Sequence, residues 1–310
     1  MRARNTAAAS RVISSSAVAL ITFLAGARLA MGETPLDRGD YLVNAVMACD
    51  GCHTPRGPDG SFAMEKRFSG GSQTWDEPAF LVKGSNITPD PTTGIGKWTD
   101  EQIITATRAG RRPNGERLIP VHPYTVFNGM AEQDLKDVVV YLRSVPPVNR
   151  ATPAKKISVP LFESVFLPAW LATFAAVETP PPSAPTSGVA RGEYLTRAVS
   201  HCGECHTPRT MTMAVDNSRF LAGNPKGKGP EGSAVPNITP DRETGLGSWS
   251  EEQIADYLET GNKPDGDVAS GLMAEVIQGS SAGYKDLTKA DRLAIAKYLK
   301  SIPPIKNRIE

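Results

Sequence analysis

The sequence is poor in the side chains that most often bind metals, because its 310 residues include only 4 cysteines and 4 histidines. It also lacks an excess of charge of one sign, with 34 lysines and arginines against 33 aspartates and glutamates. A near-neutral chain lacks the basic surface that nucleic-acid binding requires, so we expect no nucleic-acid partner. Strand signals are scarce, and no apolar run is a convincing membrane span, which needs about 20 residues.

All four cysteines fall in two copies of one motif, Cys-x-x-Cys-His. The first copy provides Cys49, Cys52 and His53, and the second provides Cys202, Cys205 and His206. Two thiols at this spacing can each form a thioether bond to one haem, and the following histidine can bind the haem iron. We therefore predict two covalently bound haem c groups.

A Cys-x-x-Cys pair can also form a redox disulfide or half of a zinc site. A structural zinc ion needs four ligands, whereas each copy of the motif offers three. Of the two remaining histidines, His201 adjoins Cys202 and is poorly placed to complete a tetrahedral site. The repetition of the whole motif favours haem over both alternatives.

Three further segments recur at almost the same distance along the chain. Residues 38–42 match 191–195, residues 86–90 match 237–241, and residues 93–98 match 244–249. The offset is 153 residues at the cysteines and 151 residues at Trp98 and Trp249. Solenoid repeats recur every 20 to 50 residues or so, so this longer period indicates a duplicated domain.

The N-terminus has the features of a targeting segment. Three arginines precede an apolar stretch around residues 17–24, and Ala30 and Gly32 offer the small residues that a signal peptidase needs. We expect residues 1–32 to be a signal peptide that is cleaved after Gly32, which would leave a periplasmic protein. An uncleaved membrane anchor is the alternative.

Each half is predicted to contain three helices separated by long loops rich in glycine and proline. The middle helices begin at Thr99 and Ser250, where a glutamine three residues later completes a capping box. They end at Gly110 and Gly261, as expected of C-terminal glycines. The predicted fold class is therefore all-α.

The repeat divides the chain into four segments. These are the signal peptide 1–32, a first domain 33–148, a linker 149–190 and a second domain 191–310. The linker holds an apolar run at 165–177 and a proline-rich stretch at 179–185. The run either forms a connector helix that packs against the domains, or belongs to an apolar surface over 157–177 that contacts a partner or, peripherally, the membrane.

Several motifs shared by the halves resemble those of a known family. They are His-Thr-Pro-Arg, Asn-Ile-Thr-Pro-Asp, a Gly-x-Trp loop and an Asp-x6-Tyr-Leu helix. Both halves resemble class I cytochrome c domains, and the combination resembles the multihaem cytochrome subunits of periplasmic alcohol, aldehyde and gluconate dehydrogenases. Those subunits usually carry three haem motifs, whereas this chain has two. The resemblance implies two tandem class I cytochrome c domains.

The resemblance also implies an electron carrier that performs no bond chemistry itself. Its electron donor would be a periplasmic dehydrogenase, and its acceptor would be linked to quinone or to an oxidase. The alternative is a dihaem redox enzyme, either a peroxidase or an oxidoreductase of small sulfur or nitrogen species. Such an enzyme keeps one haem iron open to substrate, so the sixth iron ligands distinguish the two functions.

Alignment of the halves suggests the sixth ligands. Gly115 and Gly266 each close a Pro-x-Gly turn, and seven residues later stand His122 and Met273. Methionine at this place resembles the family's sixth ligand, which assigns Met273 to the second haem and His122 to the first. Met130, eight residues after His122, is the alternative for the first haem. The predicted iron ligands are thus His53 and His122 in the first half, and His206 and Met273 in the second.

The resemblance further implies contacts to the haem propionates. Trp98 and Trp249 could donate an indole N–H to a propionate, and Arg56 and Arg209 could neutralise one. Core packing of the tryptophans and a solvated position of the arginines are the alternatives.

Overall fold

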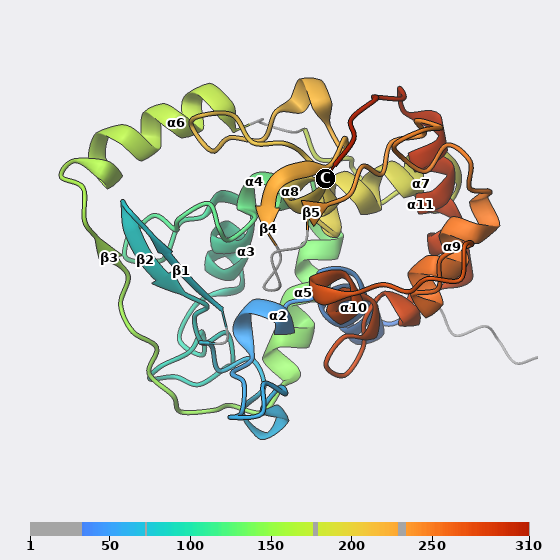
Figure 1. Cartoon of the computed structure of the whole chain (residues 1–310). Helices are drawn as coiled ribbons and strands as arrows, with labels where there is room; N and C mark the ends of the chain where they lie inside the picture. Colours follow the sequence, from blue (N-terminus) through green and yellow to red (C-terminus); the bar gives the residue numbers. More distant parts are fainter. Residues whose placement is uncertain (1–32, 72, 176–178, 229–233, 310) are drawn as a thin grey trace, which may run out of the picture. The chain divides into compact units, whose positions relative to one another are not determined.

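The computed structural model describes residues 33–71, 73–175, 179–228 and 234–309, so the expected signal peptide lies outside the described residues. From Pro35 onward the chain forms one compact unit, in which helices of the two repeats contact each other (Figure 1). The division into two domains therefore stays a prediction.

Each half begins with a helix that leads into its Cys-x-x-Cys-His motif. The first helices are α1 (Pro35–Asp40), continued by the π-helical turn η1 (Tyr41–Val46), and α7 (Gly188–Tyr194), continued by η4 (Leu195–Val199). The motifs themselves form α2 (Asp50–His53) and α8 (Cys202–His206). The π-helical turns occur at equivalent places in both halves, and such turns are frequent near functional sites.

The middle helices α3 (Asp100–Ala109) and α9 (Glu251–Thr260) begin and end where the sequence predicts. Thr99 accepts a hydrogen bond from the Gln102 backbone N–H at 3.2 Å, and both predicted capping boxes are formed. Gly110 and Gly261 follow the helices with φ of 61° and 78°, a left-handed conformation that favours glycine.

The last helices α5 (Glu132–Ser144) and α11 (Lys289–Ser301) pack across the first helices α1 and α7. Glycine makes this crossing possible. A Cβ atom on Gly39 would overlap the carbonyl oxygen of Asp137, and one on Gly192 would overlap that of Ala294. The crossing helices and the π-helical turns bury one connected apolar cluster that includes residues of both halves.

The structure is mainly helical, but it also contains two small antiparallel sheets, so the all-α class is not confirmed. The first sheet consists of β1 (Thr74–Glu77), β2 (Phe80–Lys83) and β3 (Lys156–Ile157), and the second of β4 (Asn224–Lys228) and β5 (Ala234–Val235). Phe80 pairs with both Glu77 and Ile157. Strands of two to five residues are too short to give a recognisable alternation in the sequence.

Within the described residues, five short helices lie in the loops of the two halves. They are η2 (Met64–Lys66) and α4 (Tyr124–Phe127) in the first half, and η5 (Asn217–Arg219), α10 (Gly271–Gln278) and η6 (Tyr284–Asp286) in the second. Helix α10 contains Met273, the predicted sixth ligand of the second haem, and α4 begins two residues after His122, the predicted sixth ligand of the first.

The linker contains a helix that contacts both halves, formed by η3 (Phe162–Phe166) and α6 (Leu167–Phe174). The Phe162 ring lies 5.9 Å from that of Phe80, and the Trp170 indole donates a hydrogen bond to the Thr212 carbonyl at 2.8 Å. Phe166 nevertheless remains 55% exposed. Within the described ranges, no helix is long and apolar enough to cross a membrane.

Candidate haem-binding sites

The two motif helices begin in the same unusual way. Ala48 precedes Cys49 and His201 precedes Cys202, and both have a positive φ, of 52° and 49°. A left-handed conformation outside glycine costs on the order of 1–3 kcal/mol and clusters at functional sites. It ends the π-helical turn and starts the motif helix in a new direction, in both halves.

No disulfide joins the four cysteines, all of which lie in the described ranges, and before haem attachment their thiols have a raised pKa. Burial raises the pKa of Cys49 to about 12, and the negative charge of Asp50 adds to the effect. Burial also raises the pKa of Cys52 to about 11, with a smaller contribution from Cys205. Redox disulfides of the Cys-x-x-Cys type depend on a lowered thiol pKa, so these values speak against that alternative.

Zinc fits the site no better. In the ranges that the structure describes, no group of three or more His, Cys, Asp or Glu side chains is placed to hold a metal ion. Two thiols with one histidine on the same helical turn suit haem, whose macrocycle supplies four of the iron ligands itself.

Each motif histidine is oriented by a backbone carbonyl. The Nδ1 atom of His53 lies 2.7 Å from the Ser85 carbonyl oxygen, and that of His206 lies 2.8 Å from the Pro236 oxygen. Burial lowers the pKa of both imidazoles, which keeps them neutral. A neutral ring whose Nδ1–H donates to a carbonyl leaves Nε2 free to bind a metal.

The Asn-Ile-Thr-Pro-Asp loops hold these carbonyls, a role that the sequence did not reveal. Asn86 directly follows Ser85, and its side-chain amide donates to the Val148 carbonyl at 2.8 Å and to the Thr93 hydroxyl at 3.0 Å. In the second half Asn237 follows Pro236 and donates to Ile305 at 2.8 Å. The repeated motif therefore ties the segment after the last helix to the loop that orients the histidine.

His122 lies opposite His53. Their ring centroids are 6.4 Å apart, and the rings are nearly perpendicular, at 81°. Metal–imidazole bonds are about 2 Å long and each ring centre lies roughly 1 Å beyond its nitrogen, so two rings that bound one ion from opposite sides would have centres roughly 6 Å apart. Burial lowers the pKa of His122 to about 3, and the nearby His53 adds to the effect. Its ring is therefore neutral and able to bind a metal.

Met130 is buried in the apolar cluster. Its side chain is 0% exposed, and its carbonyl accepts a hydrogen bond from Arg108 at 3.0 Å. The last helices align at an offset of 157, which matches Met130 with Leu287, also buried. Because an apolar side chain fills this place in both halves, the geometry favours His122 over Met130 as the sixth ligand.

Met273 lies in the first turn of α10, half-buried against the apolar cluster. Its pairing with His206 stays a prediction.

The two arginines that were expected near propionates have protein partners. Arg56 pairs with Glu275 of the other half at 2.6 Å and stacks on the Phe62 ring, and Arg209 pairs with Glu204 at 2.7 Å. Trp98 and Trp249 pack against the apolar cluster.

His201 has a role that the sequence did not suggest, since it joins the two halves. Its Nε2 atom lies 3.2 Å from the Met47 carbonyl oxygen, and its ring contacts that of Phe127 edge-on at 6.1 Å. The Phe127 ring in turn lies 5.8 Å from His122. A line of aromatic rings thus leads from the first predicted haem site to the residue that precedes Cys202.

No protein-family model matches the sequence. Comparison with individual proteins gives a "Diheme cytochrome c-type" protein of Cereibacter sphaeroides, 38% identical over 263 residues that cover 83% of each chain. The chain belongs to the dihaem cytochromes c. It carries two covalently bound haem c groups, and it is an electron-transfer protein rather than an enzyme in its own right.

This dihaem cytochrome c is also similar to cytochrome subunits of dehydrogenases. It is 34% identical to the fructose dehydrogenase cytochrome subunit of Gluconobacter japonicus and covers 94% of its own length but 60% of that protein. It is 34% identical to the gluconate 2-dehydrogenase cytochrome c subunit of Pantoea cypripedii, with 91% and 63% covered. The chain therefore spans less than two thirds of these subunits.

Proposed function

We propose that this dihaem cytochrome c is the periplasmic electron carrier of a dehydrogenase, and that it passes electrons to an acceptor linked to quinone or to an oxidase. The observation that carries the proposal is the pair of complete haem motifs in a chain whose relatives include named subunits of fructose, alcohol and gluconate dehydrogenases. The arginine-led apolar N-terminus supports the periplasmic part of the proposal, because it has the sequence pattern of a signal peptide.

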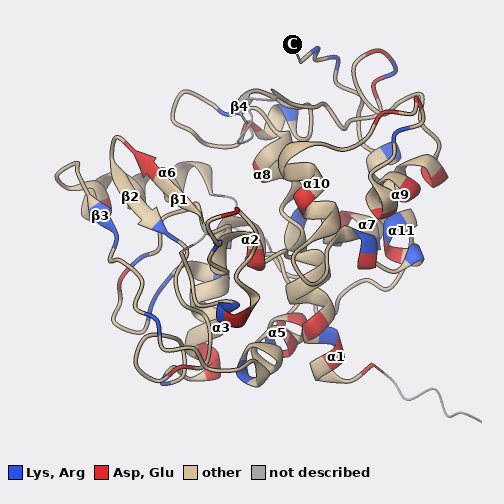
Figure 2. Ribbon diagram, turned by 60° about the horizontal axis from the view of Figure 1, so that its bottom comes forward, with Lys and Arg blue, Asp and Glu red and all other residues tan. Residues whose placement is uncertain are grey.

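The chain's own residues prepare the two sites for electron transfer rather than for substrate binding. The haem supplies the redox-active iron, and the neutral imidazoles of His53 and His206 are oriented to bind it. In the first half His122 would bind the iron from the side away from His53, which would leave no place there for a substrate. Lysines and arginines are interspersed with acidic residues along both halves (Figure 2), which suits a protein partner better than a polyanion.

The test is substrate-dependent reduction of the cytochrome. Periplasmic and membrane fractions of the producing strain would be supplied in turn with fructose, ethanol, gluconate and other dehydrogenase substrates. We expect one substrate to produce the absorbance of ferrous haem c in this protein, and deletion of its gene to slow the respiration of that substrate. Failure of every substrate to reduce the protein would contradict the proposal.

A ligand-binding experiment separates the carrier from a dihaem enzyme. Carbon monoxide and cyanide bind rapidly only where the sixth position of the iron is open or weakly held. We expect neither to change the spectrum of the purified protein within minutes. Rapid binding at one haem, together with turnover of hydrogen peroxide, would establish the enzyme instead.

A further inference from the structure

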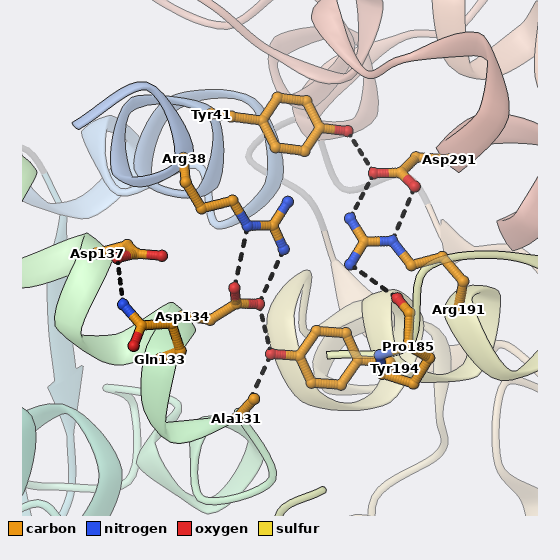
Figure 3. A network of polar contacts seen from close by, with 10 residues as sticks. All are labelled: Arg38, Tyr41, Ala131, Gln133, Asp134, Asp137, Pro185, Arg191, Tyr194 and Asp291. Atoms are coloured by element: carbon orange, nitrogen blue, oxygen red, sulfur yellow. Dashed lines mark hydrogen bonds and ion pairs between the residues drawn. The ribbon is translucent and has the colours of Figure 1, made fainter. Parts of the chain in front are cut away.

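Three residues of each half meet where the first helices α1 and α7 approach the last helices α5 and α11. Arg38, Tyr41 and Asp134 of the first half correspond to Arg191, Tyr194 and Asp291 of the second, at offsets of 153, 153 and 157 residues. Figure 3 shows the two sets side by side, with each aspartate facing an arginine and a tyrosine.

Within each half the arginine forms a bidentate ion pair with the aspartate, through two guanidinium nitrogens. Arg38 donates to Asp134 at 3.0 and 2.9 Å, and Arg191 donates to Asp291 at 2.8 and 2.7 Å. Both aspartates are buried, with exposures of 4% and 6%. A buried carboxylate is stable only when it is paired and fully hydrogen-bonded, so each aspartate needs every donor that surrounds it.

The tyrosines cross from one half to the other. Tyr194 donates its hydroxyl hydrogen to Asp134, and Tyr41 donates to Asp291, both at 2.7 Å. Each hydroxyl also accepts a hydrogen bond from the backbone N–H of the residue that precedes the last helix of the other half. Tyr194 accepts from Ala131 at 3.1 Å, and Tyr41 accepts from Thr288 at 3.3 Å. Each hydroxyl therefore satisfies a carboxylate and a helix N-terminus of the other half at once.

This arrangement is reciprocal, because the tyrosine of each half binds the aspartate of the other at matching positions. Such reciprocity is the mark of an isologous, twofold interface. Burial is the first cause that raises the pKa of both tyrosines, with the facing aspartate next, so both remain hydroxyl donors at neutral pH. We propose that the two haem-binding halves form an internal pseudo-twofold dimer, in which Tyr41 and Tyr194 are the positioning residues that hold the haem groups in one fixed relation.

A second set of contacts carries the interface to the haem sites. The turn η1 contacts η6 of the second half, η4 contacts α4 of the first, and the turns η1 and η4 contact each other. At one end of this interface His201 contacts Phe127 and the Met47 carbonyl. Movement of one half against the other would therefore displace the segments next to both Cys-x-x-Cys-His motifs.

The interface can be tested in the full-length holoprotein by a single cut in the linker. A protease site would be inserted between Pro182 and Ser183, which are both exposed. After cleavage we expect the pieces of the parent protein to elute together with two haems. A hydrogen bond to a buried carboxylate shifts an equilibrium by about tenfold to a hundredfold. The Tyr41→Phe/Tyr194→Phe variant should therefore raise the dissociation constant of the pieces about a hundredfold or more.

The matched control removes two hydroxyls, one in each half, that form hydrogen bonds to residues of their own half. Asn44 donates to the Tyr141 hydroxyl at 2.8 Å, and Arg197 donates to that of Tyr298 at 3.4 Å. The Tyr141→Phe/Tyr298→Phe variant should leave the dissociation constant within a factor of about three of the parent, well short of the tenfold that one charged hydrogen bond is worth. If the crossing pair and the control pair have the same effect, the proposal is overturned. It is also overturned if the cleaved parent separates at once.

A single variant keeps the interface testable if the double variant does not fold. Tyr41 is only half-buried whereas Tyr194 is buried, so Tyr41→Phe alone is the milder change. We expect it to weaken the association of the pieces about tenfold, the lower limit for one charged hydrogen bond. No change in this single variant would count against the interface.

Electron transfer between the haems is the functional readout, and this part rests on the proposed carrier function. After rapid one-electron reduction of the uncut protein, we expect transfer between the haems to slow at least tenfold in the Tyr41→Phe/Tyr194→Phe variant, with both reduction potentials unchanged. If the parent shows no such transfer but its cut pieces behave as predicted, the carrier function fails and the interface stands. If the variant's pieces bind as tightly as the parent's, the interface fails whatever the rate.

Discussion

At the residue scale, the chemistry of this cytochrome depends on imidazoles that burial keeps neutral. His53 and His206 are each oriented through Nδ1 by a backbone carbonyl, and His122 faces His53 with a pKa lowered to about 3, mainly by burial. At the predicted sixth-ligand position the first half has His122 and the second has Met273. Thioether sulfur favours ferrous iron, whereas a second imidazole favours ferric iron and lowers the potential.

The first prediction concerns this asymmetry. A redox titration should resolve two waves, with the first half as the low-potential site. His122→Met should raise the lower wave on the order of 0.1 V or more, within the roughly 0.8 V over which axial ligands tune haem, and should leave the upper wave nearly unchanged.

Met130→Leu is the matched control, because leucine stands at the equivalent position in the second half. It should shift neither wave. If Met130→Leu moves the lower wave and His122→Met does not, Met130 is the sixth ligand of the first haem.

At the element scale, each half is built on the crossing of its first and last helices. The crossing brings Gly192 of α7 against the backbone of α11, and Gly39 of α1 against that of α5. The same crossing places the arginine before each glycine next to the aspartate of the last helix. The Arg-Gly pair in the repeat therefore combines a packing requirement with an ion pair.

The second prediction follows from the close approach at Gly192. Helix propensity alone would make Gly192→Ala stabilising by about 1 kcal/mol. We expect instead a loss of about 2 kcal/mol in the free energy of unfolding, because the added methyl group must push α7 away from α11. Denaturant unfolding followed by circular dichroism would measure the change.

Glu193→Ala provides the comparison, since Glu193 is the exposed neighbour in the same helix. Its effect should stay within about 0.5 kcal/mol. A stabilising Gly192→Ala would mean that the two helices are not in close contact.

At the scale of the whole molecule, the chain is a duplicated haem-binding unit whose halves are joined by a linker helix and by reciprocal side-chain contacts. The linker contacts the first half through Phe162 and the second through Trp170. Arg56 and Glu275 add an ion pair between the halves. The halves are thus held together by more than the covalent chain.

The third prediction is the haem stoichiometry. Four cysteines allow four thioether bonds, so a pyridine haemochrome assay on the mature protein should give two haems for each chain. Cys202→Ser/Cys205→Ser should leave one haem, at the first motif. A value of one haem in the unmodified, fully matured protein would contradict the prediction that each half binds a haem.

The fourth prediction concerns export. N-terminal sequencing of the protein from the periplasm should begin at Glu33 or within a residue or two of it. Recovery of a protein that begins at Met1 from carbonate-washed membranes would show that the leader is retained as an anchor.

The cofactor, the repeat and the helix boundaries at Thr99 and Ser250 could be predicted from residue types and their spacing, because all three depend on local sequence. Two thiols and a histidine must be adjacent to hold one haem, and a cap needs only its own first turn.

Contacts between segments that are distant in the sequence could not be predicted, because they depend on how the folded chain brings those segments together. The strand β3 exists because β2 lies beside it, and no local signal in two residues could predict that pairing. The carbonyls of Ser85 and Pro236 orient the histidines only once the loops fold over the motifs. Likewise, a tyrosine near a haem motif does not reveal in the sequence that its hydroxyl reaches an aspartate 250 residues away, because that bond depends on how the halves meet.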